Sequence, residues 1–77
     1  MDYNEGKVDD TALALLYLTS FTDHGYTRTW RNIAWEITDR LYEKGFIHDP
    51  KGKAKSIVFT DEGKKKSEAL FNEFFSE

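Results

Sequence analysis

The sequence contains no cysteine, although it is only 77 residues long. Disulfide bonds and thiolate metal sites are therefore excluded, and the fold must be stabilised by packing alone. A chain of this length holds one domain, and small domains bury a smaller fraction of their surface than large ones do. We expect a single domain over residues 1–77, and the lack of cysteine suits a cytoplasmic protein.

Long apolar runs are also missing. The longest, Ala12 to Leu18, is far shorter than the roughly 20 residues that a membrane-spanning helix needs. The first residues, Met-Asp-Tyr-Asn-Glu, are acidic and lack the positive region of a secretory signal. We therefore expect neither membrane insertion nor secretion.

Groupings typical of catalytic or metal sites are scarce. His24 and His48 stand apart in the sequence, without the spacing of paired metal ligands. Asp23 and His24 follow Ser20 closely, but together with Gly25 they are explained more simply as a turn than as a catalytic triad. We expect no enzymatic activity, no cofactor and no metal.

The net charge of -3 hides a segregation along the chain. Residues 1–43 and 67–77 are acidic, whereas residues 44–66 carry seven basic and three acidic side chains. A protein that binds nucleic acid over its whole surface would be basic overall, so binding here would need one patch. The lysines of this segment could contact phosphates, or they could be ordinary solvated residues that protect a hairpin edge.

Twelve aromatic side chains are many for so short a chain. They could form a core built from rings, or part of them could form a surface for self-association or for a partner protein. In the second case the candidate rings are Trp30, Trp35, Tyr42, Phe71, Phe74 and Phe75.

The apolar pattern predicts three helices. The first runs from about Val8 to Phe21, with Asn4 or Asp9 as its N-cap. The second runs from Asn32 to Lys44, and Gly45 should end it in a Schellman motif. Within this second helix we expect three features: a core stripe of Ile33, Ile37 and Leu41, a second aromatic edge of Trp35 and Tyr42, and a pair between Glu36 and Arg40.

Strand signals lie on both sides of the second helix. The residues from Tyr26 to Trp30 favour a short strand with Tyr26, Arg28 and Trp30 on one face. A hairpin should follow the second helix, with legs at residues 46–48 and 56–60 and a turn at residues 49–52. Thr60 is then a good N-cap for the last helix, which should pack on the first through its apolar face.

The motif Leu41-Tyr-Glu-Lys-Gly-Phe-Ile47, followed by Ile57-Val-Phe-Thr-Asp-Glu-Gly-Lys64, resembles the wing half of multiple-antibiotic-resistance-type and PadR-type bacterial regulators. The whole chain also resembles a family of small uncharacterised bacterial proteins, through Leu15 to Thr19, Thr27 to Trp30, Trp35, and Asp39 to Pro50. The regulators place two helices between the first helix and the glycine before the wing, whereas here only about twenty residues, Gly25 to Lys44, are available. A strand and one full helix would use nearly all of them, so the helix-turn-helix would be truncated. The resemblance implies nucleic-acid binding. It also implies dimer contacts through the terminal helices, where Phe71, Phe74 and Phe75 are the candidate interface residues.

The predicted fold is a small α+β, winged-helix-like domain, in the order helix, strand, helix, hairpin, helix, with a three-stranded sheet. The first functional hypothesis is an accessory nucleic-acid-binding or transcription-regulatory protein that contacts DNA phosphates through the wing. Its candidate residues are Arg28, Arg31, Lys51, Lys53, Lys55, Lys64 and Lys65. The second is a protein-interaction module, homodimeric through the three phenylalanines and without nucleic-acid binding.

Overall fold

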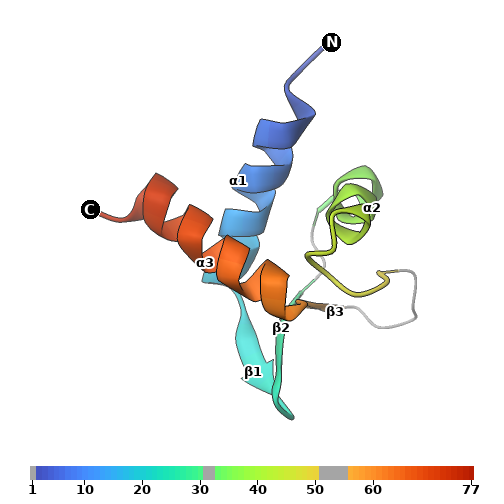
Figure 1. The fold of residues 1–77 in the computed structure, drawn as a ribbon, viewed down its shortest axis with the longest axis vertical. Helices are drawn as coiled ribbons and strands as arrows, with labels where there is room; N and C mark the ends of the chain where they lie inside the picture. Colours follow the sequence, from blue (N-terminus) through green and yellow to red (C-terminus); the bar gives the residue numbers. More distant parts are fainter. Residues whose placement is uncertain (1, 31–32, 51–55) are drawn as a thin grey trace.

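The fold is a small α+β arrangement of three helices and a three-stranded antiparallel sheet (Figure 1). It was analysed in a computed structural model, which describes residues 2–30, 33–50 and 56–77. The elements follow the chain as α1 (Glu5–Leu18), β1 (Phe21–Asp23), β2 (Tyr26–Trp30), α2 (Trp35–Glu43), β3 (Ser56–Val58) and α3 (Asp61–Phe75).

Helix α1 is the centre of the molecule, because it packs against α2, α3 and β2. It begins three residues earlier than predicted, since Asn4 accepts a hydrogen bond from the backbone N–H of Lys7 and caps the helix. It ends at Leu18 instead of Phe21, because Phe21 belongs to a strand. The predicted packing of α3 on α1 is confirmed, and the rings of Tyr17 and Phe71 meet there with centroids 5.4 Å apart.

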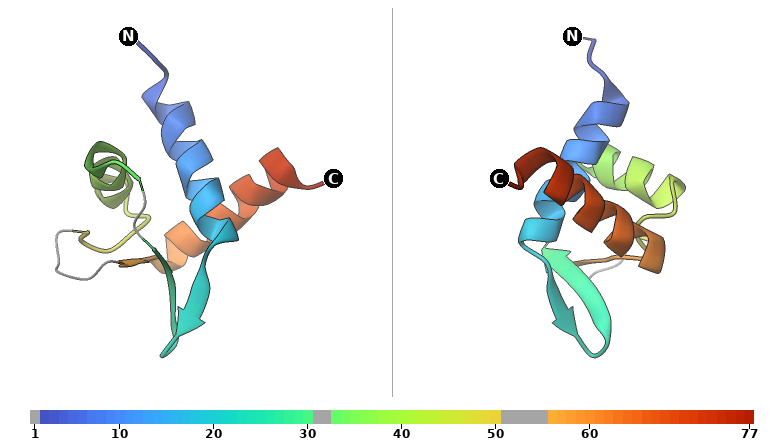
Figure 2. Two further views of the ribbon diagram at one scale, coloured as in Figure 1. Left: turned by 180° about the vertical axis from the view of Figure 1, so that it is seen from behind. Right: turned by 60° about the vertical axis from the view of Figure 1, so that its left-hand side comes forward.

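Strand β1 was not predicted. It forms a hairpin with β2 through a two-residue turn, His24 and Gly25, and both residues have positive φ (51° and 83°), as a type I′ turn requires. The prediction placed Phe21 in the first helix, because this residue continues the apolar pattern of α1. The hairpin projects from the body of the molecule, away from the free ends of α1 and α3 (Figure 2).

The prediction for β2 is confirmed, with the same bounds from Tyr26 to Trp30. The second helix is shorter than predicted: α2 begins at Trp35, so Ile33 precedes it, although Ile33 and Ile37 both pack against the core as expected. Its end is confirmed as a Schellman motif, because Phe46 N–H binds the Leu41 carbonyl and Gly45 N–H binds that of Tyr42. Gly45 has the expected positive φ, of 81°.

The predicted hairpin after α2 is present only in part. Its legs are joined by an isolated bridge between Ile47 and Phe59, whereas β3 pairs over its whole length with β2. Of the predicted turn, residues 51 and 52 lie outside the described residues.

Thr60 caps α3 as predicted, because its hydroxyl accepts a hydrogen bond from Gly63 N–H. The same hydroxyl donates to the carbonyl of Gly45 over 2.6 Å, so the start of α3 is held against the end of α2. Close packing explains why position 63 is a glycine, because a Cβ there would lie 1.6 Å from the carbonyl oxygen of Phe46.

Candidate nucleic-acid interface

The two faces of the sheet differ in what they contact. Along β2, Thr27 and Thr29 point to the inner face, toward α1, and Thr29 is fully buried with its hydroxyl 2.8 Å from that of Thr19. Because side chains alternate along a strand, Tyr26, Arg28 and Trp30 point to the opposite, outer face. The predicted grouping of these three residues on one face agrees with this burial pattern.

The neighbouring strands complete the outer face. Phe21 of β1 and Val58 of β3 both pair with Arg28, one on each side, and Ser56 pairs with Trp30. The rings of Phe21 and Trp30 are in tilted contact, with centroids 5.8 Å apart. The Nε of Arg28 donates a hydrogen bond of 3.3 Å to the Ser56 hydroxyl, which holds the arginine side chain across the sheet toward β3.

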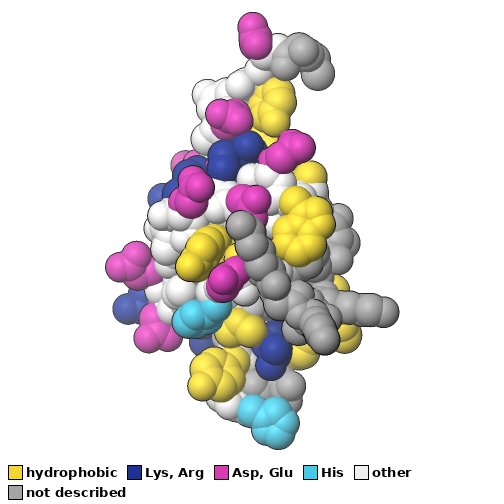
Figure 3. All heavy atoms as spheres, turned by 90° about the vertical axis from the view of Figure 1, so that its right-hand side faces the viewer, with side chains coloured by type: hydrophobic (Ala, Val, Ile, Leu, Met, Phe, Trp, Pro, Cys, Tyr) yellow, Lys and Arg dark blue, Asp and Glu magenta, His cyan; other side chains and the backbone are white. Residues whose placement is uncertain are grey.

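We call Phe21, Tyr26, Arg28 and Trp30 the hairpin platform. Its rings are well exposed, at 38% for Phe21, 58% for Tyr26 and 59% for Trp30. Figure 3 shows hydrophobic side chains around a basic one just above the lower end of the molecule, where the hairpin lies in Figure 1. Exposed rings next to a cation form a surface suited to nucleic-acid bases and phosphates.

The predicted basic residues separate into two groups. Arg28 belongs to the hairpin platform, and Lys64 and Lys65 are exposed in the first half of α3. Lys64 lines a small hollow together with Gly25 and Tyr26, so it lies beside the platform. The remaining four, Arg31, Lys51, Lys53 and Lys55, lie outside the described residues.

The sequence prediction did not assign the three rings of the platform to the site. The available signal was the hairpin: two runs rich in aromatic residues and threonine, Phe21 to Asp23 and Tyr26 to Trp30, are separated by a two-residue turn that ends in glycine. This pattern places Phe21 opposite Arg28.

The outward-facing side of α2 carries the opposite charge. Glu36 and Glu43 are exposed there, while the cations of Arg40 and Lys44 are directed to α1. Carboxylates repel phosphates, so α2 is poorly suited to enter a groove of DNA.

A cluster of charged side chains joins α2 to α1 around Asp9, which is 1% exposed. Arg40 binds both oxygens of this carboxylate, with its Nη2 2.8 Å from Oδ1, and Lys44 binds Oδ2 at 2.9 Å. Arg40 also binds Glu5 at 3.0 Å, so the cation that was predicted to pair with Glu36 binds two carboxylates of α1.

The pKa values within this cluster follow from the contacts. Burial acts to raise the pKa of Asp9, but the hydrogen bonds from Arg40 and Lys44 outweigh it and hold that pKa below its ordinary value. The hydrogen bonds to Asp9 raise the pKa of Arg40. Asp9 and Arg40 therefore stay charged at neutral pH, and the cluster connects α2 to α1.

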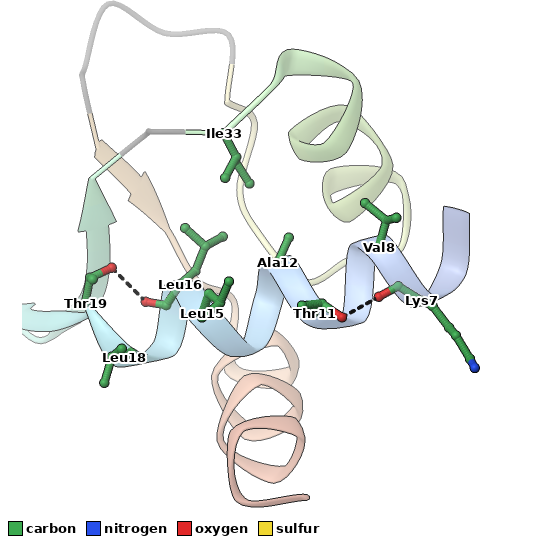
Figure 4. A pocket seen from close by; sticks show the side chains of 9 residues that line it. All are labelled: Lys7, Val8, Thr11, Ala12, Leu15, Leu16, Leu18, Thr19 and Ile33. Atoms are coloured by element: carbon green, nitrogen blue, oxygen red, sulfur yellow. Dashed lines mark hydrogen bonds between the residues drawn. The ribbon is translucent and has the colours of Figure 1, made fainter. Parts of the chain in front are cut away.

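The predicted interface residues border an exposed apolar surface. Phe71 is half-buried against Tyr17, whereas Phe74 and Phe75 are 43% and 45% exposed, and these two line a hollow of about 300 Å³ with Lys7 and Thr11. A second hollow has a volume of about 540 Å³. In Figure 4, Ile33 faces the side of α1 across this hollow. Its other lining residues come from α1 and its C-cap: Lys7, Val8, Thr11, Ala12, Leu15, Leu16, Leu18 and Thr19. The two hollows share Lys7 and Thr11, so they adjoin.

Among the residues that the structure describes, no cluster of three or more histidine or carboxylate side chains could hold a metal ion. In the same part of the chain, every helix is too short or too polar to cross a bilayer.

Comparisons with known proteins identify a family. The family model described as "Domain of unknown function (DUF6429)" matches residues 4–77. A relative from Sinorhizobium fredii (strain NBRC 101917 / NGR234), "Uncharacterized protein y4hR", is 47% identical over 76 residues, which cover 99% of each chain. No solved structure matches the chain. The chain therefore belongs to the DUF6429 family of small bacterial proteins.

Proposed function

We propose that this protein is an accessory nucleic-acid-binding protein with a regulatory role in the cytoplasm, and that the hairpin platform is its main contact surface. The observation that carries the proposal is the position of Arg28, which stands among three rings on a solvent-facing sheet surface. Arginine binds phosphate with two hydrogen bonds and also stacks on aromatic groups, so this surface offers both kinds of contact. The proposal includes no catalytic step.

A winged-helix-like origin is part of this proposal. The sheet pairs β2 with β3, and the chain after β3 bridges back to Ile47, which is an arrangement compatible with a wing. Only four residues separate Trp30, the end of β2, from Trp35, the start of α2. This short connection supports a truncated helix-turn-helix, and because α2 is also acidic, the sheet is the better candidate for nucleic acid.

Phosphate contacts by lysine complete the proposed site. Lys64 lies beside Tyr26, and Lys65 follows it on an exposed helix turn. The wing lysines Lys51, Lys53 and Lys55, together with Arg31, remain in the proposal on the basis of the sequence. Such contacts add affinity that depends on salt and carry little sequence information.

The test is a binding titration with labelled mixed-sequence oligonucleotides, single-stranded and duplex, at about 50 mM and about 200 mM salt. We expect weaker binding at the higher salt concentration. Loss of phosphate contacts in Arg28→Gln and in the double variant Lys64→Gln/Lys65→Gln should weaken binding and reduce the salt slope by about 1 per lost contact. Lys7→Gln, on the far part of α1, is the matched control. The absence of binding to any probe at low salt would refute the proposed function.

A protein-interaction role is the second candidate, and the apolar surface of α1 and α3 favours it. Leu15 and Leu18 are 49% and 62% exposed on α1, and Phe74 and Phe75 stand exposed on α3. Exposed apolar surface of this kind is often a protein contact. Its charges suit a second copy of the chain, because Lys7 is the only basic residue of α1 whereas α3 has only acidic charges after Lys66. A homodimer could therefore bring Lys7 of each copy to the acidic end of α3 in the other.

Sedimentation at micromolar concentration tests this second candidate. We expect a dimer that Leu18→Glu converts to a monomer, because the substitution introduces a charge into the exposed apolar surface of α1. Leu18 is largely exposed, so folding should be kept. Glu36→Gln, at an exposed position of α2 outside the proposed contact, is a control for a change of charge alone. A wild-type chain that stays monomeric at high micromolar concentration would exclude the homodimer.

A further inference from the structure

The sizes of the side chains on the two faces of β2 are the reverse of what packing alone would select. The buried inner position is occupied by Thr29, while the exposed outer positions carry Tyr26 and Trp30. Large rings are usually the first side chains to be buried, because each removes a large apolar area from water. Three rings on one exposed sheet face therefore indicate a contact made outside the chain's own core.

We propose that the hairpin platform binds single-stranded nucleic acid by stacking unpaired bases on Tyr26 and Trp30, an inference that rests on the proposed function and names its ligand. A duplex hides the faces of its bases within its own stack, whereas a single strand can splay its bases onto aromatic side chains. The ligand class is a single strand of DNA or RNA with little sequence preference.

The geometry of a strand sets the spacing of this site. Residues two apart on one face of a strand are about 6.7 Å apart, so the Cα atoms of Tyr26 and Trp30 are separated by about 13 Å with Arg28 between them. At this spacing each ring would receive its own base from an extended strand. Arg28, at the midpoint, is placed to contact the phosphates that join them.

The platform is also partly organised before any ligand arrives. Phe21 contacts Trp30 with ring centroids 5.8 Å apart, which restricts the orientation of the tryptophan. The hydrogen bond from Arg28 Nε to Ser56 similarly restricts the arginine. Side chains that are already ordered lose less conformational entropy on binding, so more of the favourable free energy of stacking contributes to affinity.

The experiment compares a single-stranded probe of about 12 nucleotides with the duplex of the same sequence, by fluorescence anisotropy at low salt. We expect the single strand to bind more tightly than the duplex. Tyr26→Leu and Trp30→Leu should each weaken single-strand binding about tenfold, because each removes one stacking ring. Tyr26→Phe, which keeps the ring, should retain the affinity.

The chain supplies a matched control for each ring. Tyr42 and Trp35 on α2 are 46% and 49% exposed, so Tyr42→Leu and Trp35→Leu remove similar rings from another surface. These two variants should bind the single strand as the wild type does. A circular dichroism melt of each variant confirms that it is folded.

The possible failures are distinguishable. Equal binding of duplex and single strand, with the platform variants indistinguishable from the α2 variants, overturns the stacking inference while phosphate binding by Arg28 and the lysines stands. If neither probe binds the wild type at low salt, both the inference and the proposed function fail.

Discussion

The inner and outer faces of the sheet show how one strand serves two purposes. On the inner face, Thr29 and Ile57 pair across β2 and β3 and are almost completely buried. On the outer face, Arg28 and Trp30 alternate with them, and Trp30 is more than half exposed. Burial therefore follows the position in the pleat and not the hydrophobicity of the residue. The positions that stabilise the fold and the positions available to a ligand are separated residue by residue.

The largest expected effect is on the inner face. Ile57→Ala removes a fully buried side chain from the core, and we expect the free energy of unfolding to fall by about 3 kcal/mol. Val58→Ala, one residue further along and on the outer face, should cost less than about 1 kcal/mol. Urea unfolding measures both. Equal losses for the two variants would mean that the two faces do not differ in their contribution to the fold.

The buried carboxylate of Asp9 extends the comparison of buried and exposed positions to a charged group. Its replacement tests whether a buried charge contributes to stability. Asp9→Asn removes the carboxylate that Arg40 and Lys44 share, and we expect a loss of about 2 kcal/mol. This loss of unfolding free energy is smaller than the loss expected for a fully enclosed ion pair, because the side chains of Arg40 and Lys44 are 20% and 39% exposed. Asp10→Asn, the neighbouring control, should stay within about 0.5 kcal/mol of the wild type. A loss as small as that of the control would mean that the cluster adds no net stability.

Local chemistry explains which parts of this fold could be predicted from the sequence. The Schellman motif at Gly45 and the cap at Thr60 depend on residues within one helix turn, and both were predicted. The contact of Arg40 with Asp9 joins residues 31 apart, so the sequence suggested the nearer partner Glu36. Strand β1 is only three residues long and exists through its pairing with β2, so its propensity alone gave no clear signal.

The candidate site could be predicted only in part, for the same reason. Tyr26, Arg28 and Trp30 share a face within one strand, and the alternation of the sequence was enough to group them. Phe21 joins them only through the register of the hairpin, which pairs it with Arg28. The prediction from the sequence assigned lysines to the site, because they are clustered in the chain. The exposure of the rings is determined by tertiary packing, so it could be seen only in the structure.

A smaller effect is expected from acid, and it applies to the buried carboxylate alone. Because the pKa of Asp9 is lowered in the folded state, its contribution to stability is present at neutral pH and is lost as the pH falls through that lowered value. The difference in unfolding free energy between the wild type and Asp9→Asn should therefore narrow as the pH falls below about 4. Urea unfolding over this range measures it. A constant difference would contradict the assigned charge state.

The smallest effect on stability is expected on the outer face. Tyr26→Thr removes an exposed ring but keeps a residue that favours strands, so the free energy of unfolding should change by less than about 0.5 kcal/mol. A thermal or urea unfolding curve checks this, and a loss above about 1.5 kcal/mol would show that the ring packs on the fold. If stability is unchanged while the affinity for a single strand falls, the loss of binding comes from the missing contact and not from unfolding. Tyr26 would then be required for binding the ligand and not for folding.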